Sequence, residues 1–317
     1  MIQRLQAIHC PYSLWASVST AANPQYSSFR RVSSHGAIGK SGSHMISSLK
    51  IPTAADLVAN APSSWQPYMR LMRIDKPVGT WLLYWPCTWS IALATPAGEL
   101  PSLYYLTLFG AGALLMRGAG CVINDMWDKD FDRRVERTKM RPLACGVLNQ
   151  RQALTFAGGL LCASFSILMQ MNWFSVAVGS ASMFLVVGYP LAKRYTYWPQ
   201  FVLGLTFNYG ALLGWSAIQG SLSLTPVVLY LAALQWTLIY DTIYAHQDKA
   251  DDIMIGVKST ALRFGATTKY WLGGFSAAKI AGLGLVGHLA EQTWPYYLGL
   301  AGTNVFVTVS WIDCRNC

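Results

Sequence analysis

Two short acidic segments contain most of the chain's 14 acidic residues. In the first, Asn124, Asp128 and Asp132 are four residues apart and would form one stripe on a helix. Asp248 and Asp252 repeat this spacing in the second segment. Like charges at this spacing repel each other, and a hard divalent cation offsets that repulsion. Because Mg²⁺ combines carboxylate oxygens with substrate phosphates, two facing stripes predict Mg²⁺ ions held on a diphosphate.

The alternative interpretation is a solvated acidic loop whose carboxylates pair with neighbouring Lys and Arg. It suits Asp130 and Glu136, which lie off the stripe. Two clusters with helical spacing, four apolar segments apart and each followed by basic residues, favour the metal site instead. They also suggest an internal duplication.

The elements that must position these residues are long apolar segments. The chain is 53% hydrophobic and 12% charged, whereas soluble proteins are about 25% charged. After Pro77 come eight runs, each long enough to cross a bilayer as a helix. They are expected at 78–97, 102–123, 152–171, 173–191, 201–219, 225–244, 270–289 and 294–312. The runs lack the period-two alternation of barrel strands, so the sequence predicts an all-α, polytopic transmembrane helical bundle.

The basic residues are confined to alternate connections between these runs. The connections near 98–101, 172, 220–224 and 290–293 contain no Lys or Arg, whereas 124–151, 192–200 and 245–269 are rich in them. This is the positive-inside pattern, and it places both acidic segments on one basic face. The net charge of +10 therefore indicates membrane sidedness, and no nucleic-acid partner is expected.

Two basic residues fall inside the runs. Arg117 lies seven residues before Asn124, on the same helical face and two turns deeper, so a functional role is favoured. Lys279 lies in the middle of the seventh run, where snorkelling or an internal pair is favoured.

The segment 1–55 is rich in Ser and has Arg and Lys but no acidic residue. This composition is typical of an organelle transit peptide. A mitochondrial leader is the first choice, a plastid leader the second, and a disordered tail the remaining alternative.

Several motifs closely resemble the UbiA family of intramembrane aromatic prenyltransferases. The pattern N-D-x-x-D-x-x-x-D spans 124–132, and D-x-x-Y-A-x-x-D-x-x-D-D spans 241–252. The segments 73–80 and 189–196 are similar to further family elements. The resemblance covers about residues 66–300, and a transmembrane prenyltransferase domain is expected over 66–313.

The resemblance implies roles for individual residues. Its metal contacts fall on Asn124, Asp128, Asp132, Asp248 and Asp252, with Asp125 and Asp251 in support. Diphosphate-binding candidates are Arg73, Lys76, Arg117, Lys139, Arg141 and Lys258, although Lys76 and Lys139 suit membrane anchoring equally well. Arg194, in the element Lys193-Arg194-Tyr195, is implied to bind the acceptor's carboxylate. Tyr195 and Tyr244 either wall the site or anchor the chain at the interface. The catalytic set is Asp128, Asp132, Asp248, Asp252 and Arg194.

Within the family, the chain looks most like the members that prenylate 4-hydroxybenzoate in ubiquinone biosynthesis. That likeness implies polyprenyl diphosphate and 4-hydroxybenzoate as substrates and Mg²⁺ as cofactor. It also implies a mitochondrial inner-membrane location with the active site facing the matrix. The lipid bilayer and other ubiquinone-biosynthesis enzymes are the implied partners.

Three alternatives stay open at this point. The acceptor could instead be homogentisate, a chlorophyllide-type ring or haem. An ion transporter would also contain intramembrane carboxylates, although transporter sites lie near the bilayer midplane. The family usually has nine transmembrane helices and eight are expected here, so an inactive truncated form is the third alternative.

Overall fold

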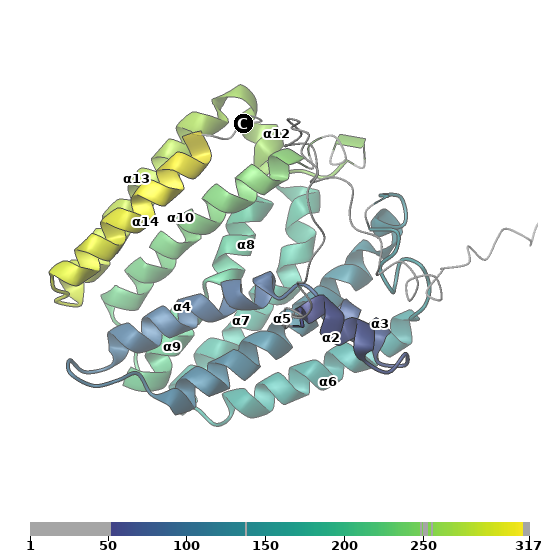
Figure 1. The fold of residues 1–317 in the computed structure, drawn as a ribbon, viewed down its shortest axis with the longest axis horizontal. Helices are drawn as coiled ribbons and strands as arrows, with labels where there is room; N and C mark the ends of the chain where they lie inside the picture. The colour runs from purple at the N-terminus through teal and green to yellow at the C-terminus, as the bar shows by residue number, and fades with distance from the viewer. Residues whose placement is uncertain (1–51, 137, 248, 250–252, 255, 313–317) are drawn as a thin grey trace, which may run out of the picture.

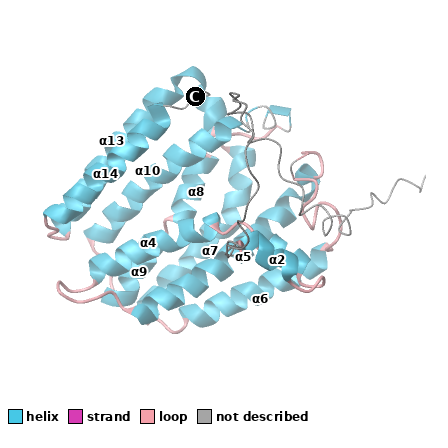
Figure 2. Ribbon diagram, viewed as in Figure 1, coloured by secondary structure: helices cyan, strands magenta, loops and turns pink. Residues whose placement is uncertain are grey.

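The computed structural model describes residues 52–312 except 137, 248, 250–252 and 255. All of its regular elements are helices, and the described residues form no strand (Figure 2). The predicted all-α bundle is therefore confirmed. The predicted leader lies almost wholly outside the described residues and stays a prediction. The same holds for the metal roles of Asp248, Asp251 and Asp252.

Every predicted apolar run forms helix. The helices are α4 (Val78–Ala94), α5 (Leu103–Asp132), α6 (Gln150–Leu168), α7 (Trp173–Tyr195), α8 (Pro199–Phe207), α9 (Gly210–Gln219), α10 (Leu224–Gln247), α13 (Thr268–Leu289) and α14 (Trp294–Ile312). Six stretches of the described chain are long and apolar enough to cross a membrane. The helix α4, with 17 residues, is shorter than these six. Shorter helices precede and interrupt the bundle: α2 (Ala54–Asn60), α3 (Gln66–Leu71), α12 (Thr260–Phe264) and η2 (Gly265–Thr267).

Side-chain caps explain where several helices begin. Asn149 accepts a hydrogen bond from the Gln152 amide, and the Gln152 side chain accepts one from the Asn149 amide, which caps α6. Asn172 caps α7 by accepting from the Ser175 amide. These caps satisfy N–H groups that the first turn of a helix leaves without partners.

The fifth predicted run differs from the expectation, because it is two helices and not one. The helix is interrupted by a turn at Asn208 and Tyr209, which separates α8 from α9. The Asn208 side chain donates to the Gly204 carbonyl and to the Thr237 hydroxyl, at 2.8 Å in each case. These bonds satisfy the buried Asn208 side-chain amide at the break, as buried polar groups require.

Of the helices that extend beyond their predicted ends, α5 and α7 gain charged residues by doing so. The helix α5 continues to Asp132, so the first acidic stripe lies on a spanning helix and not in a connection. The helix α7 continues to Tyr195 and includes Lys193 and Arg194, which were expected in a link. Both extensions bring charged residues into the bundle's packed end.

The helices pack mainly as neighbouring pairs: α4 on α9, α5 on α6, and α10 on α13 (Figure 1). In this view the α4–α5 connection and the α13–α14 turn, which carry no Lys or Arg, lie at the left. The end of α10 and helix α12 lie toward the opposite side. This arrangement agrees with the predicted separation of basic and non-basic connections.

One apolar cluster supports the charged end of α5. It joins α3, α5, the 133–149 connection and α6 through Leu71, Val122, Leu143 and Ala153, all of which are fully buried. Burial of such side chains is worth about 1.5–3 kcal/mol each for the larger ones. The cluster therefore fixes the 133–149 connection against α5, on the face next to Asp125.

Candidate active site

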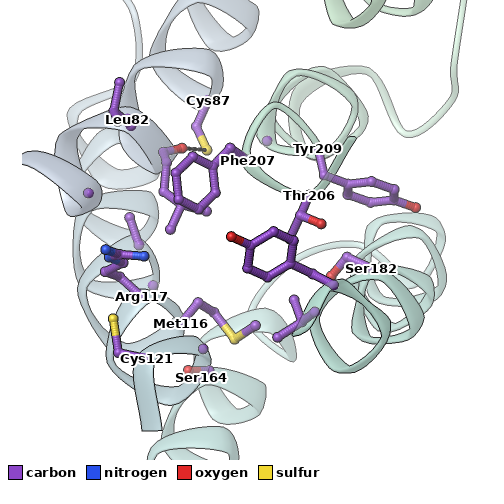
Figure 3. A pocket seen from close by; sticks show the side chains of 18 of the residues that line it. Leu82, Cys87, Met116, Arg117, Cys121, Ser164, Ser182, Thr206, Phe207 and Tyr209 are labelled. Atoms are coloured by element: carbon purple, nitrogen blue, oxygen red, sulfur yellow. Dashed lines mark hydrogen bonds between the residues drawn. The ribbon is translucent and has the colours of Figure 1, made fainter. Parts of the chain in front are cut away.

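A cavity of about 1150 Å³ runs among α4, α5, α6, α7, the α8–α9 pair and α10. Figure 3 shows Arg117, Met116 and Cys121 on one side of this space and Ser182, Thr206 and Tyr209 on the other. These segments, although separated in sequence, thus share one interior. This volume lies slightly above the usual range for small-ligand sites.

One part of the cavity lining is charged, and it collects residues that the sequence singled out. Of the predicted site residues, the cavity is lined by Arg73, Lys76, Arg117, Asn124, Asp125, Arg141 and Tyr244. They come from the segment before α4, from α5, from the following connection and from α10. The tertiary structure therefore brings together residues up to 171 positions apart, counted from Arg73 to Tyr244 (244 minus 73).

Asp125 is the centre of an ion-pair network at this charged end. One Arg73 Nη donates to both Asp125 carboxylate oxygens at 3.1 Å. Arg141 donates to Asp125 at 3.0 Å and to Asp132 at 2.7 Å. Asp125 is 1% exposed, so its charge needs such partners. The network ties the segment before α4 and the 133–149 connection to α5.

The two arginines of this network are themselves constrained. Burial lowers the pKa of Arg141, but the carboxylates of Asp125 and Asp132 raise it more, so the net shift is upward. Arginine stays protonated in proteins in any case, so Arg141 contributes a permanent positive charge. Arg73 has a φ of 61°, a left-handed conformation that is uncommon for a non-glycine residue. The contact of one Arg73 Nη with both Asp125 carboxylate oxygens holds that conformation in place.

Arg117 lies deeper along the same face of α5, as its spacing from Asn124 predicted. Its guanidinium packs 5.6 Å from the centre of the Phe207 ring. The Arg117 Nε is buried without a hydrogen-bond partner among the described residues. On α4, Gly79 leaves room for this guanidinium, because a Cβ at Gly79 would collide with it. A buried cation with an unused donor, facing a cavity, is suited to bind an anion.

Asp128 and Asp132 complete the predicted stripe but do not line the cavity. They are 3% and 7% exposed and lie on the buried side of α5. An Arg194 Nη lies 3.8 Å from an Asp128 carboxylate oxygen and donates to the Trp127 carbonyl at 2.7 Å. Arg194 also stacks near the rings of Trp127 and Phe131. Arg194 is thus held at the edge of the site and not in the cavity.

The described side chains of the remaining basic and aromatic candidates, Lys139, Lys258 and Tyr195, do not line the cavity. Lys139 pairs with Glu136 at the surface. Lys258 donates to the Tyr195 carbonyl at 3.2 Å and lies over the Tyr197 ring. The Tyr195 side chain is exposed. Lys193 lies on α7, and its side chain is outside the described set. Their proposed roles stay predictions.

The second motif contributes to the same cavity through its first turn. Asp241 and Tyr244, on α10, line the cavity together with Asn124 and Asp125 of the first motif. The described ends of the two motifs therefore converge at one end of the bundle. The later carboxylates of the second motif lie outside the described residues.

Sequence reasoning named Tyr244 but missed the aromatic stripe on α10 to which it belongs. Trp236, Tyr240 and Tyr244 line the cavity at intervals of four residues, and Tyr189 of α7 lines it as well. The Tyr240 hydroxyl is buried without a hydrogen-bond partner among the described residues. The i, i+4, i+8 spacing was available as a signal. It was hidden because such spacing is equally typical of ordinary packing in an apolar helix.

The rest of the cavity lining is largely apolar. Its lining side chains include Leu82, Phe109, Leu161, Phe165 and Met183. The cavity therefore has a charged end and an apolar interior, which matches an amphiphile with an anionic head and a hydrocarbon tail.

Oxygen donors that suit Mg²⁺ cluster beside the charged end, although they do not complete a metal site by themselves. Asn124 and Asp125 line the cavity, and Asp128 and Asp132 lie behind them. Within the described ranges, no group of three or more His, Cys, Asp or Glu side chains is arranged to hold a metal ion. Amide and carboxylate oxygens are the ligands that Mg²⁺ prefers, so the donor chemistry fits.

Comparison of the sequence with protein-family models shows to which family the chain belongs. The model described as "UbiA prenyltransferase family" matches residues 83–316, which is most of the chain. The chain belongs to the UbiA prenyltransferase family. The family match includes both motifs and the helices that surround the cavity. It confirms the resemblance that the motifs had indicated.

Curated relatives within the UbiA family are similar over most of the chain. A Caenorhabditis elegans protein named "4-hydroxybenzoate polyprenyltransferase, mitochondrial" is 70% identical over 254 residues, 80% of this chain and 71% of that protein. The Homo sapiens protein of the same name is 57% identical over 257 residues, 81% of this chain and 69% of that protein.

Solved structures of UbiA homologues share the fold. A homologue from Aeropyrum pernix K1 superposes with a TM-score of 0.64 at 21% identity, over 74% of this chain and 87% of that one. A homologue from Archaeoglobus fulgidus, described as bound to DMAPP and Mg²⁺, gives 0.62 at 19% identity, over 78% and 86%.

Proposed function

We propose that the protein transfers a polyprenyl group from polyprenyl diphosphate to the ring of 4-hydroxybenzoate, in ubiquinone biosynthesis at the mitochondrial inner membrane. One observation carries the proposal: both family motifs meet at the charged end of a cavity whose interior is apolar. Relatives at 70% and 57% identity bear the name of this activity. Their names also support the mitochondrial location that the leader's composition suggested.

The charged end of the cavity is proposed to bind the diphosphate of the donor. Lys76 and Arg117 line the cavity, and neither is paired with a carboxylate among the described residues. Arg73 and Arg141 form ion pairs with Asp125, and these pairs keep that end of the cavity ordered. Arginine suits this task because its planar fork matches phosphate oxygens. The polyprenyl tail would then lie along the apolar lining.

The proposed metal ligands are Asn124, Asp128, Asp132, Asp248 and Asp252, with Asp125 and Asp251 in support. Mg²⁺ held there would neutralise the charge of the departing diphosphate as a Lewis acid. An A. fulgidus homologue of the same fold is described as bound to an allylic diphosphate, DMAPP, and Mg²⁺. That description supports the metal without showing it for this chain.

The reaction breaks the bond between the allylic carbon and oxygen, and the diphosphate leaves with the electron pair. The ring carbon of 4-hydroxybenzoate ortho to the hydroxyl bonds to that allylic carbon and then loses its proton. Trp236, Tyr240 and Tyr244 present aromatic rings along the cavity. Such rings can stabilise a developing allylic cation through their faces. The apolar lining excludes water, which would otherwise capture the cation.

Membranes containing the expressed protein test this proposal directly. Supplied with polyprenyl diphosphate, Mg²⁺ and labelled 4-hydroxybenzoate, they should form labelled lipid product, whereas labelled homogentisate should give none. Chelation with EDTA should abolish transfer, and added Mg²⁺ should restore it. Transfer to homogentisate alone would contradict the proposed acceptor. Transfer that persists in EDTA would contradict the proposed need for Mg²⁺.

Two matched variants locate the chemistry on α5. Asp128→Asn should lower kcat/KM by about 10²-fold or more, since charge near the leaving group is lost. Asp130→Asn, on the exposed face of the same helix, should keep kcat/KM near that of the unchanged protein. Equal activity of the two variants, at equal amounts of inserted protein, would show that Asp128 has no role in the site.

A further inference from the structure

Lys279 is a buried lysine in the middle of the membrane-spanning helix α13. Its residue is 5% exposed, so the side chain is packed against protein and does not lie on the outer surface of the bundle. The described residues place no carboxylate in an ion pair with it. Charges at such depth are costly to insert and are often functional.

The Lys279 ammonium lies over an aromatic ring that belongs to the cavity wall. Its Nζ is 5.5 Å from the centre of the Trp236 ring of α10. Trp236 in turn lines the cavity. The two helices that carry these residues are closely packed, because Gly282 of α13 meets Ala232 of α10 and His246 of α10 bonds to Thr268 of α13 at 3.0 Å.

The depth of Trp236 identifies what it would touch. It precedes Asp241 by five residues on α10, so it lies about 7.5 Å farther from the charged end. If the diphosphate binds at that end, as proposed above, the first isoprene units of the donor reach this depth. The inference therefore rests on the proposed function for the identity of the ligand.

We propose that Lys279 is a positioning residue, whose ammonium holds the Trp236 ring as a wall against the first isoprene units of the donor. Indole is the best aromatic partner for a cation, and the interaction strengthens when both groups are removed from water. In this proposal the buried lysine serves to fix the ring. Loss of its charge should therefore weaken binding of the donor more than binding of the acceptor.

The test compares Lys279→Met with Lys279→Arg in the full chain. Methionine keeps the length and removes the charge, so insertion should not suffer, because a buried charge without an ionic partner has been replaced by an apolar group. The KM for geranyl diphosphate should rise about three- to tenfold, the range of a partly buried cation–π contact. The KM for 4-hydroxybenzoate should stay unchanged, and Lys279→Arg should restore most of the donor's KM.

Ser276→Ala is the matched control for altering a buried polar residue on α13. Ser276 lies one turn from Lys279, is buried, and its hydroxyl has no hydrogen-bond partner among the described residues. Its substitution should leave both KM values unchanged. A rise equal to that of Lys279→Met would show a general packing effect and overturn the positioning role.

A double-mutant cycle with Trp236→Leu tests the mechanism. If Lys279 acts through the ring, Lys279→Met should add little to the effect of Trp236→Leu on the KM of geranyl diphosphate. Independent, multiplicative effects would overturn the inference, as would an unchanged donor KM in Lys279→Met. Absence of any transfer by the unsubstituted protein would instead refute the proposed function, so the two failures are distinguishable.

Discussion

At the scale of single residues, the site depends on how charges are paired inside a membrane protein. Asp125, Asp128 and Asp132 are all buried, and arginines from three different segments approach them. Arg73 and Arg141 are ordered by Asp125, whereas Arg117 is held by packing and keeps an unused Nε donor. The network therefore separates cations that build the site from a cation that is open to a ligand.

Arg141→Leu tests the structural half of this network. Loss of the guanidinium leaves Asp132 without this partner and Asp125 with Arg73 as its remaining arginine. The unfolding free energy should fall by about 2 kcal/mol, less than for a fully buried pair because Arg141 is partly exposed. Thermal unfolding in detergent measures this, with the exposed Arg134→Leu as control. Equal melting temperatures for the two variants would contradict the predicted role.

Gly79→Ala tests the placement of Arg117. An added Cβ would meet the flexible end of the Arg117 side chain and not a backbone atom. The guanidinium should therefore move, with a stability change below about 1 kcal/mol and a fall in kcat/KM of about ten- to hundredfold. Gly188→Ala, where the new Cβ meets no atom within 4 Å, is the control. Unchanged kinetics in Gly79→Ala would show that the position of Arg117 is unimportant.

At the scale of elements, the cavity exists because α4 and the α8–α9 pair approach closely without filling the space beside them. Gly210 and Gly214 of α9 lie against Cys87 of α4, and Ser90 donates to the Ala211 carbonyl. Small residues permit such backbone contact in membranes, where helices associate by packing. Phe207 and Tyr209 lie on either side of Asn208, where the helix is interrupted, and both line the cavity.

Gly214→Ala tests the α4–α9 contact. Its Cβ would lie 2.7 Å from the Cys87 carbonyl oxygen, a backbone atom that cannot move without its helix. The variant should lose about 2 kcal/mol of stability through overpacking. Gly158→Ala on α6, whose Cβ would meet nothing within 4 Å, should unfold near the temperature of the unchanged protein. A Gly214→Ala variant as stable as this control would mean that α4 and α9 separate easily.

At the scale of the whole molecule, the topology places both motifs at one end of the bundle. The basic connections lie at that end and the turns without Lys or Arg at the other, so the site and the positive-inside signal share one membrane face. A donor whose head is anionic and whose tail is lipid can then enter from the membrane with its head at the surface.

Cysteine labelling tests this sidedness. In a variant whose native cysteines are replaced by serine, cysteines placed at Arg134 and Tyr197 should react with an impermeant maleimide from one side. Cysteines at Gly98 and Ser221 should react from the other. All four positions are exposed. Labelling of Arg134 and Gly98 from the same side in intact mitoplasts would overturn the topology.

The sequence by itself determined the class of molecule and much of its site. Apolar runs, the alternation of basic connections and the spacing of Asn124, Asp128 and Asp132 predicted the helices, their sidedness and the stripe on α5. These features are local, or they repeat along the chain, and helix geometry converts them directly into position. The two motifs were enough to suggest the family that the comparison then established.

Only the tertiary structure decided which of these residues meet. Arg117 and Arg194 had both been assigned to substrate binding. The tertiary structure placed Arg117 in the cavity but Arg194 beside Trp127, outside it. It also divided the fifth run at Asn208, where the Thr237 hydroxyl from a distant helix accepts the side-chain hydrogen bond. In a membrane almost every helix face is apolar, so the sequence pattern does not tell lipid-facing from cavity-facing positions, and packing between distant helices makes that choice.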